Sequence, residues 1–228
     1  MYYCKKLIKI KIIALLTVLF SVTYTVGQTQ KDSLIVFVGE IIEVKYSPEE
    51  KKEELPDTVI RNGKKVVMET ITISMDSRYL AKYKVLQLVY GTYKEDTIEF
   101  IVYDHYGQPG FSKYKTVLLF VSKLKGRLYH EKYQYFDVYK TTDNRWASPG
   151  DPYKFDSYHK KELKPQKIKF KENVFYDLQQ YDKDRIKALF PQEYYRISQK
   201  KAYPLVGTYI EDLFTVKKEG VLKARGIF

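Results

Sequence analysis

The sequence predicts a mainly β (α+β) protein, with a small β-barrel over residues 28–147 and a helical, basic C-terminal extension over residues 148–228. Two observations predict this fold class. Short runs rich in Val, Ile, Tyr and Phe follow one another as far as residue 141, with turn signals between them. Beyond residue 150, two segments have apolar residues at helical spacing. Hydrophobic residues make up 44% of the 228, enough to bury a core, which excludes general disorder.

Residues 1–27 have the three parts of a secretory signal peptide. Four lysines within residues 1–11 precede an apolar run over residues 12–26, and small residues precede a possible cleavage site before Gln28. The apolar run has about 15 residues, fewer than the ~20 that a membrane span needs. We therefore expect an exported protein that is periplasmic, envelope-associated or secreted. An uncleaved N-terminal anchor is the alternative interpretation.

The charge and cysteine content change once the predicted signal is set aside. The whole chain has a formal net charge of +12, of which the signal carries +4, residues 28–147 carry +2 and residues 148–228 carry +6. The single cysteine, Cys4, leaves with the signal. A disulfide scaffold and a cysteine zinc site are therefore excluded, and core packing must stabilise the exported chain.

The predicted barrel begins with a long strand and a hairpin. Residues 33–46 form a β-branched and aromatic run with Gly39 in its middle, which predicts a strand with a bulge or a sharp bend. Between two apolar runs of residues 57–74 lies Asn62-Gly63. This dipeptide supplies the two positive φ angles of a tight turn, so it predicts a hairpin.

Four further strands are predicted. Residues 79–90 alternate between two faces, and residues 97–103 are rich in β-branched and aromatic side chains. A loop with two glycines and a proline follows at residues 106–110. The continuous apolar run at residues 116–122 is typical of a strand covered on both sides. A Tyr-rich strand over residues 128–141 completes a closed or half-closed barrel.

Residues 33–146 resemble the OB-type barrel of the netrin-module and tissue-inhibitor-of-metalloproteinase group. The resembling runs are VFVGEI at 36–41, YKVLQLVYG at 83–91, TIEFIV at 97–102 and YKTVLLFV at 114–121. The resemblance implies an OB-like fold and an extracytoplasmic binding role. The group's inhibitors chelate the target's zinc through an N-terminal cysteine, and this chain has no cysteine from Gln28 onward.

The C-terminal extension is predicted to contain two or more helices. Residues 148–152, Ser-Pro-Gly-Asp-Pro, are typical of a linker. Asp182 is positioned to cap a helix over residues 182–190, and Thr208 with Glu211 has capping-box spacing for a helix over residues 208–219. Residues 221–228 are apolar enough to pack as a last strand. We expect these elements to pack on the barrel, because their apolar faces need a partner.

A basic stripe is the first candidate binding feature. Lys167, Lys169 and Lys171 alternate with Ile168 and Phe170, so an extended chain places the three lysines on one face. Such a stripe suits an anionic partner, such as an acidic glycan, lipid head groups or nucleic acid. The alternative interpretation is an edge strand that lysines protect from aggregation.

A tyrosine face is the second candidate. Period-two alternation along residues 128–139 places Tyr129, Tyr133, Tyr135 and Tyr139 on one face of a strand. Tyrosines in a row can stack on sugar rings or bases. The alternative interpretation is a half-buried ladder that stabilises the sheet. Export and the shortage of arginine, only seven residues, argue against nucleic acid as the partner.

Catalytic signals are weak. The three histidines lie in different segments without metal-site spacing, so we assign no metal ligand, cofactor or catalytic residue. His105 is kept as a binding candidate because it follows Asp104 where a strand enters a loop. Neighbouring residues on a strand point to opposite faces, so Asp104 is badly placed to orient His105.

These observations predict an exported, non-catalytic binding protein. It would engage a protein, a glycan or an anionic envelope component through the barrel loops and the tyrosine face. The alternative is an envelope hydrolase that uses His105 and nearby carboxylates. The oligomeric state is left open.

Overall fold

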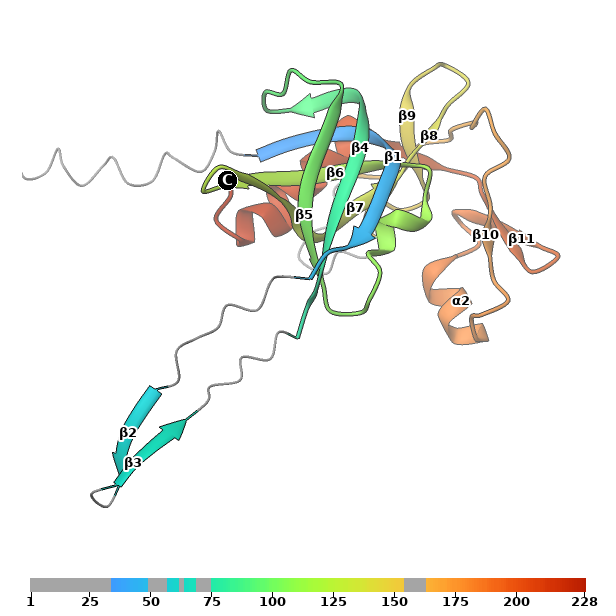
Figure 1. Cartoon of the computed structure of the whole chain (residues 1–228). Helices are drawn as coiled ribbons and strands as arrows, with labels where there is room; N and C mark the ends of the chain where they lie inside the picture. The colour runs from blue at the N-terminus through green and yellow to red at the C-terminus, as the bar shows by residue number, and fades with distance from the viewer. Residues whose placement is uncertain (1–33, 49–56, 62–63, 69–74, 154–162) are drawn as a thin grey trace, which may run out of the picture.

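The structure, a computed structural model, describes residues 34–48, 57–61, 64–68, 75–153 and 163–228. These residues form a closed five-stranded barrel, two three-stranded sheets, one two-stranded sheet and short helices (Figure 1). The predicted mainly β fold class is confirmed. The predicted signal peptide lies outside the described residues. Within the described part of the chain, no helix combines the length and apolar character needed to cross a membrane.

Five long strands build the barrel. They are β1 (Leu34–Tyr46), β4 (Ser77–Tyr90), β5 (Thr97–Asp104), β6 (Thr116–Leu124) and β7 (Arg127–Asp137). Their order around the barrel is β1-β4-β5-β7-β6, and β6 pairs with β1 to close it. Neighbours are antiparallel except β5 and β7, which are parallel and paired at Ile101 and Tyr129. This closed mixed barrel is compatible with an OB-like barrel.

Strand alternation follows the sequence pattern in β4. Ala81 and Tyr83 are fully buried in the barrel interior, whereas Lys82 and Lys84, which alternate with them, are exposed. The rings of Tyr83 and Phe100 stack there with centroids 5.8 Å apart. The predicted two-faced alternation of this strand is confirmed.

Gly39 marks a bend in β1. The register of β1 with β4 shifts between Val38 and Gly39, which confirms the predicted irregularity. A Cβ atom at residue 39 would lie 2.7 Å from Phe37 Cε2 and 3.0 Å from Tyr83 Cδ1. Only glycine fits beside these interior rings without displacing them.

A second apolar core covers the outer face of β1 and β6. Helix α3 (Ile210–Lys217) and the π-helical segment η3 (Lys218–Leu222) supply its C-terminal side. Leu213 packs there in one buried cluster with Leu34 and Phe120. As expected for a strand covered on both sides, β6 is buried continuously from Val117 to Val121. The C-terminal extension therefore packs on the barrel.

Two small sheets complete the C-terminal part of the chain, by which we mean the described residues that follow β7. One contains β8 (Tyr139–Lys140), β9 (Trp146–Pro149) and β13 (Gly207–Tyr209), and the other contains β10 (Tyr176–Asp177), β11 (Tyr195–Ser198) and β12 (Lys201–Pro204). Helix α2 (Lys183–Leu189) lies beside the second sheet (Figure 1). Phe190 and Tyr195 belong to a separate small core there.

The sequence predicted one helix start and the hairpin correctly. Asp182 caps α2, its carboxylate accepting a hydrogen bond of 2.7 Å from the Arg185 backbone N–H. Strands β2 (Asp57–Arg61) and β3 (Lys64–Met68) pair as an antiparallel hairpin. Their predicted turn residues, 62–63, lie outside the described residues.

Three predictions for the C-terminal extension are wrong. Ser148 of the predicted linker is buried in β9 and pairs with Thr208 of β13. Because Thr208 is paired in a strand, it cannot cap a helix, and α3 instead starts at Ile210 without a side-chain cap. The last strand predicted at 221–228 is not formed, since Val221 and Leu222 belong to η3.

We predict that Gly39→Ala lowers the free energy of unfolding by about 1–3 kcal/mol, because the added methyl group overpacks the barrel interior. Chemical denaturation of the purified chain measures this change. Glu43→Ala in the exposed half of β1 is the control, with an expected change below about 0.5 kcal/mol. Equal effects of the two substitutions would contradict the close packing around Gly39.

Candidate ligand-binding pocket

The candidate site is built on an irregularity in β7. In its pairing with β6, Val121 is opposite His130 and Leu119 is opposite Tyr135. Two steps along β6 therefore correspond to five along β7, and the three extra residues of β7 form a large bulge. Tyr133 lies within it at φ +65°, a left-handed conformation that is uncommon for a residue other than glycine.

The bulge exchanges the inner and outer faces of β7. Before it, the even-numbered His130 faces the interior; after it, the odd-numbered Tyr135 does so and contacts Phe111 with ring centroids 5.9 Å apart. Tyr129 lies on the outer face, where it stacks on Tyr103 at 6.5 Å. The prediction of one continuous tyrosine face is therefore wrong.

The four predicted tyrosines have separate surroundings. Tyr133 is 43% exposed, whereas Tyr129, Tyr135 and Tyr139 are half-buried. Tyr139 packs against Phe170, with ring centroids 6.0 Å apart. Only Tyr133 and Tyr135 line the pocket described next.

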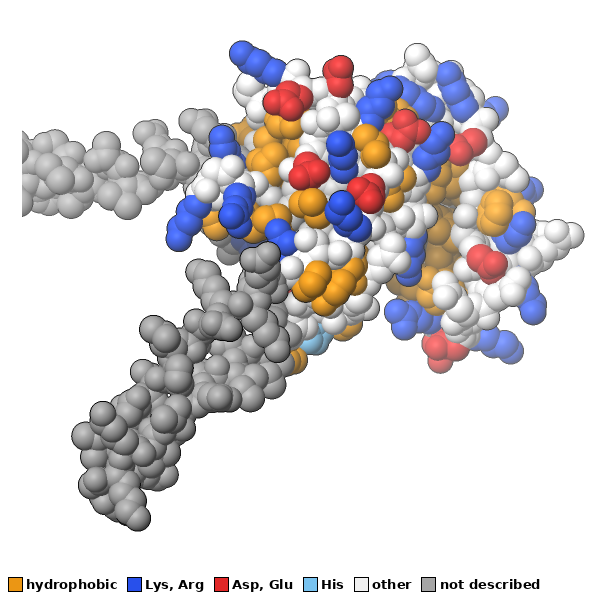
Figure 2. Space-filling model, viewed as in Figure 1, with side chains coloured by type: hydrophobic (Ala, Val, Ile, Leu, Met, Phe, Trp, Pro, Cys, Tyr) orange, Lys and Arg blue, Asp and Glu red, His pale blue; other side chains and the backbone are white. Residues whose placement is uncertain are grey.

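A pocket of about 570 Å³ lies between the bulged end of the barrel and the C-terminal part. The end of β5, the bulge of β7 and the 3₁₀ helix η2 (Gly110–Lys113) form its barrel side. Residues of β9, β10, α2, the last residue of α3 and the loops at 151–152, 181 and 190 form the remaining wall. Figure 2 shows hydrophobic side chains gathered at the junction of these two parts.

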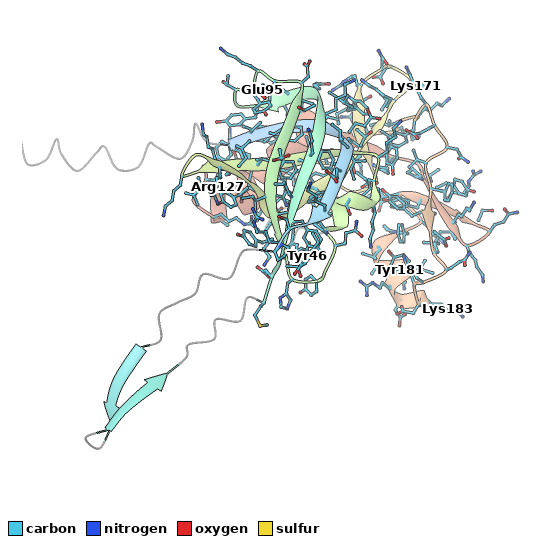
Figure 3. All side chains as sticks on the ribbon, in the orientation of Figure 1. Tyr46, Glu95, Arg127, Lys171, Tyr181 and Lys183 are labelled. Atoms are coloured by element: carbon cyan, nitrogen blue, oxygen red, sulfur yellow. The ribbon has the colours of Figure 1, made fainter. Side chains whose placement is uncertain are left out.

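Aromatic rings contribute much of the wall. They come from the barrel and from the C-terminal part, and they are Tyr106, Phe111, Tyr114, Tyr133, Tyr135, Phe136, Tyr176, Tyr181 and Phe190. Tyr181 is labelled in Figure 3, where it lies beside α2. Burial, and secondarily the charge of Asp137, raise the pKa of the Tyr135 phenol. Tyr135 therefore stays protonated at neutral pH and can donate a hydrogen bond.

Both signs of charge face the pocket. Asp104 is 7% exposed and accepts a 2.9 Å hydrogen bond from the Tyr106 backbone N–H. Asp137 accepts a 2.7 Å hydrogen bond from the Tyr176 hydroxyl. Lys217, the last residue of α3, is 6% exposed, and its Nζ lies 5.0 Å from the centre of the Phe136 ring.

His130 and Gln134 form a buried polar pair inside the bulge. His130 Nε2 lies 2.9 Å from the Gln134 carbonyl oxygen, to which it donates. Burial lowers the pKa of His130 from 6.5 to about 4, so the ring is neutral at pH 7. Gln134 Nε2 donates to the Lys132 carbonyl oxygen at 3.1 Å, while Gln134 Oε1 is buried without a partner among the described residues.

His105 lies outside the pocket lining. Its Nδ1 is 2.9 Å from the Met75 carbonyl oxygen and 3.5 Å from Asp76 Oδ1, and its side chain is exposed. Asp104, in contrast, points into the pocket. The two side chains point apart, as the strand geometry predicts, so Asp104 does not orient His105.

The basic stripe is a separate surface. Lys167, Lys169 and Lys171 are exposed, while Ile168 is buried and Phe170 half-buried, which confirms the predicted alternation. None of the three lysines belongs to the pocket lining, and in Figure 3 Lys171 lies well apart from Tyr181, which does.

The chain around the stripe covers sheet edges. Gln166 pairs with Gly207 of β13, and Phe170 pairs with Thr141, which follows β8. The segment thus joins both edges of the sheet that contains β8, β9 and β13. This placement agrees with the edge-protection interpretation and leaves the three lysine side chains accessible.

Several pocket residues were missed in the sequence. The bulge that turns Gln134 into the pocket contains no glycine or proline, the usual signals of strand irregularity. Asp137 and Tyr176 meet across 39 residues of sequence, which no local pattern shows. Lys217 is the buried last residue of α3, and its place in the pocket wall depends on how that helix packs on the barrel, which the sequence does not show. Within the described segments, no group of three or more His, Cys, Asp or Glu residues is placed to hold a metal ion.

No model of a known protein family matches the chain, and no significant match to a curated protein or to a solved structure was found. The fold defines a closed five-stranded β-barrel protein, and the pocket between the barrel and the C-terminal part is its candidate site.

We predict that stability falls as the pH decreases from about 6.5 to about 4, because the unfolded chain takes up a proton on His130 that the folded chain does not. His130→Gln, which cannot titrate, should remove about 3 kcal/mol of this pH dependence. Urea unfolding of both chains across this range measures the difference. Parallel pH profiles for the two chains would contradict the buried, neutral state of His130.

We predict that changing Lys167, Lys169 and Lys171 together to Gln weakens binding to vesicles that contain phosphatidylglycerol at low salt, by roughly 1 kcal/mol per lysine. Vesicle sedimentation measures the partition coefficient.

The matched control removes the same charge from the barrel by changing Lys82, Lys84 and Lys94 to Gln. Unchanged vesicle binding with increased aggregation in the first variant would instead show that the stripe only protects a sheet edge.

Proposed function

We propose that the protein is an exported, non-catalytic binding protein that holds its ligand in the pocket between the barrel and the C-terminal part. The observation that carries this proposal is the composition of the pocket wall, in which many aromatic rings surround a few fixed polar groups. Its volume of about 570 Å³ falls within the usual range for small-ligand sites.

The pocket side chains are held in place before any ligand arrives. Asp137 is held by the Tyr176 hydroxyl at 2.7 Å, and this hydrogen bond joins the barrel to the extension at the site. Phe111 is 1% exposed and packs against His130, with ring centroids 4.7 Å apart. Preorganised walls reduce the entropy lost on binding, which favours a binding role for this space.

The arrangement of the histidines supports binding over hydrolysis. The imidazole of His130 is engaged with a backbone carbonyl group at 2.9 Å. His105, on which the hydrolase alternative depends, is exposed and outside the pocket lining. A general base must reach the proton that it removes from a bound substrate, and neither placement favours that role.

Export and family resemblance belong to this proposal. Export is inferred from the basic, apolar and small-residue pattern of residues 1–27. The closed barrel is compatible with the OB-like fold of the netrin-module and tissue-inhibitor-of-metalloproteinase group, and the resemblance to that group implies an extracytoplasmic binding role.

We predict that Gln108→Trp blocks the pocket, because Gln108 is an exposed residue of its lining and tryptophan adds a large ring there. Compounds from a panel of neutral oligosaccharides, spermidine, citrate and short peptides that bind the unaltered chain should lose about tenfold or more in affinity, or 1.4 kcal/mol. Ligand-observed NMR measures binding and also reports any hydrolysis.

Gln87→Trp on the exposed outer face of β4 is the matched control and should bind like the unaltered chain. Binding that survives Gln108→Trp would place the ligand elsewhere. Hydrolysis of a panel compound that His105→Ala abolishes would establish the enzyme alternative.

A further inference from the structure

Two lysines lie opposite each other where the basic stripe meets β8. The bridge between Thr141 and Phe170 is antiparallel, and beside it the Lys171 backbone N–H donates to the Lys140 carbonyl oxygen at 2.8 Å. This register places Lys140 opposite Lys171, with both side chains on the solvent side because Thr141 is fully buried. Like charges directly opposite each other are destabilising, so the fold alone does not favour this pair.

Asn144 holds the two side chains, which we call the ammonium pair, at one place. Lys140 Nζ donates to the Asn144 carbonyl oxygen at 3.0 Å, and Lys171 Nζ donates to Asn144 Oδ1 at 2.9 Å. The turn that presents Asn144 is itself fixed. Thr141 Oγ1 donates to the Arg145 carbonyl oxygen at 2.9 Å and accepts from the Arg145 backbone N–H at 3.0 Å. Each ammonium group has three N–H donors, so both keep donors for a ligand.

The carboxylates nearby do not neutralise the ammonium pair. Asp143 accepts a 3.1 Å hydrogen bond from the Tyr209 hydroxyl, and Glu211 pairs with Arg145 at 3.1 Å. Glu172 is exposed and forms no salt bridge with a described residue. This face therefore has a surplus of positive charge, since three acidic side chains meet five basic ones, which are Lys140, Arg145, Lys167, Lys169 and Lys171.

The composition of this face indicates a polar anionic partner. Within the described ranges 139–146 and 163–172, no large hydrophobic side chain is exposed, since Ile168 and Phe170 turn inward. Insertion into a bilayer would bury charge here without burying apolar area. Nucleic acid is recognised best through arginine, but Arg145 lies 3.5 Å from the centre of the Tyr209 ring and is paired with Glu211. A polar polymer with carboxylate groups meets neither objection.

We propose that this face binds an acidic polysaccharide, with one carboxylate held between Lys140 and Lys171 and others at Lys167 and Lys169. The three lysines of the stripe alternate in an extended chain, so they repeat about every 7 Å and suit a polymer with repeating charges. Protection of a sheet edge does not explain Lys140, which belongs to β8, or the asparagine that holds it. This second site lies outside the pocket and shares only the predicted export with the proposed function.

The experiment titrates the full exported chain with polygalacturonate and with neutral dextran by isothermal calorimetry. The salt concentration is about 150 mM, at which long-range attraction is screened. Polygalacturonate should bind and dextran should not. Changing Lys140 and Lys171 together to Gln should lower the affinity about tenfold or more, the effect of losing one charge-assisted hydrogen bond. The melting temperature should stay equal or rise, because a pair of like charges is removed.

The matched control changes Lys82 and Lys84 together to Gln, which removes the same charge from the exposed face of β4. It should change the affinity by less than about twofold, because screened charges outside the site contribute little. Asn144→Gly separates geometry from charge, since it removes Oδ1 and keeps the left-handed backbone at φ +68°. The affinity should fall while its salt dependence stays the same.

Four results would overturn the inference. Polygalacturonate that fails to bind the unaltered chain would remove the site and leave the pocket function intact. Equal losses in the two double variants would reduce the effect to overall charge. Vesicles with phosphatidylglycerol that bind more tightly than polygalacturonate at the same salt would make a lipid surface the partner. Loss of polygalacturonate binding in Gln108→Trp would move the polysaccharide into the pocket.

Discussion

The large bulge in β7 is the constraint on which the rest of the structure depends. β7 must pair with β6 and β5 to close the barrel, and it must also supply the wall of the pocket. The extra residues between His130 and Tyr135 let one strand do both, because they exchange its faces within a few residues. The left-handed backbone at Tyr133 is the conformational cost of this arrangement.

The C-terminal extension is the second half of the site and of the fold. It covers the barrel through α3, and it meets the pocket through Tyr176 and Lys217. Within the extension, the Tyr195 hydroxyl of β11 donates to the Pro149 carbonyl oxygen of β9 at 3.3 Å, which joins the two small sheets. Gly150, at φ +81°, has no room for a side chain, since a Cβ atom would collide with that hydroxyl.

Local patterns predicted the local structure well. Period-two alternation located the barrel strands, and Asp182 located the start of α2, because both signals depend on neighbouring residues. The failures involve partners far apart in sequence. Ser148 looked like a linker residue until its pairing with Thr208 made it part of a strand. Gln134 entered the site only because a bulge without glycine or proline turned its side chain inward.

The parallel junction of β5 and β7 has a dynamic consequence. Among the described residues, these strands are in register at one pair, Ile101 and Tyr129, whereas β1 and β4 pair along most of their length. Local opening of the barrel should therefore start at this seam, and its amide protons should exchange with solvent before those between β1 and β4. The stacked rings of Tyr103 and Tyr129 lie over this junction on the outer face of the barrel, and their contact stabilises it against opening.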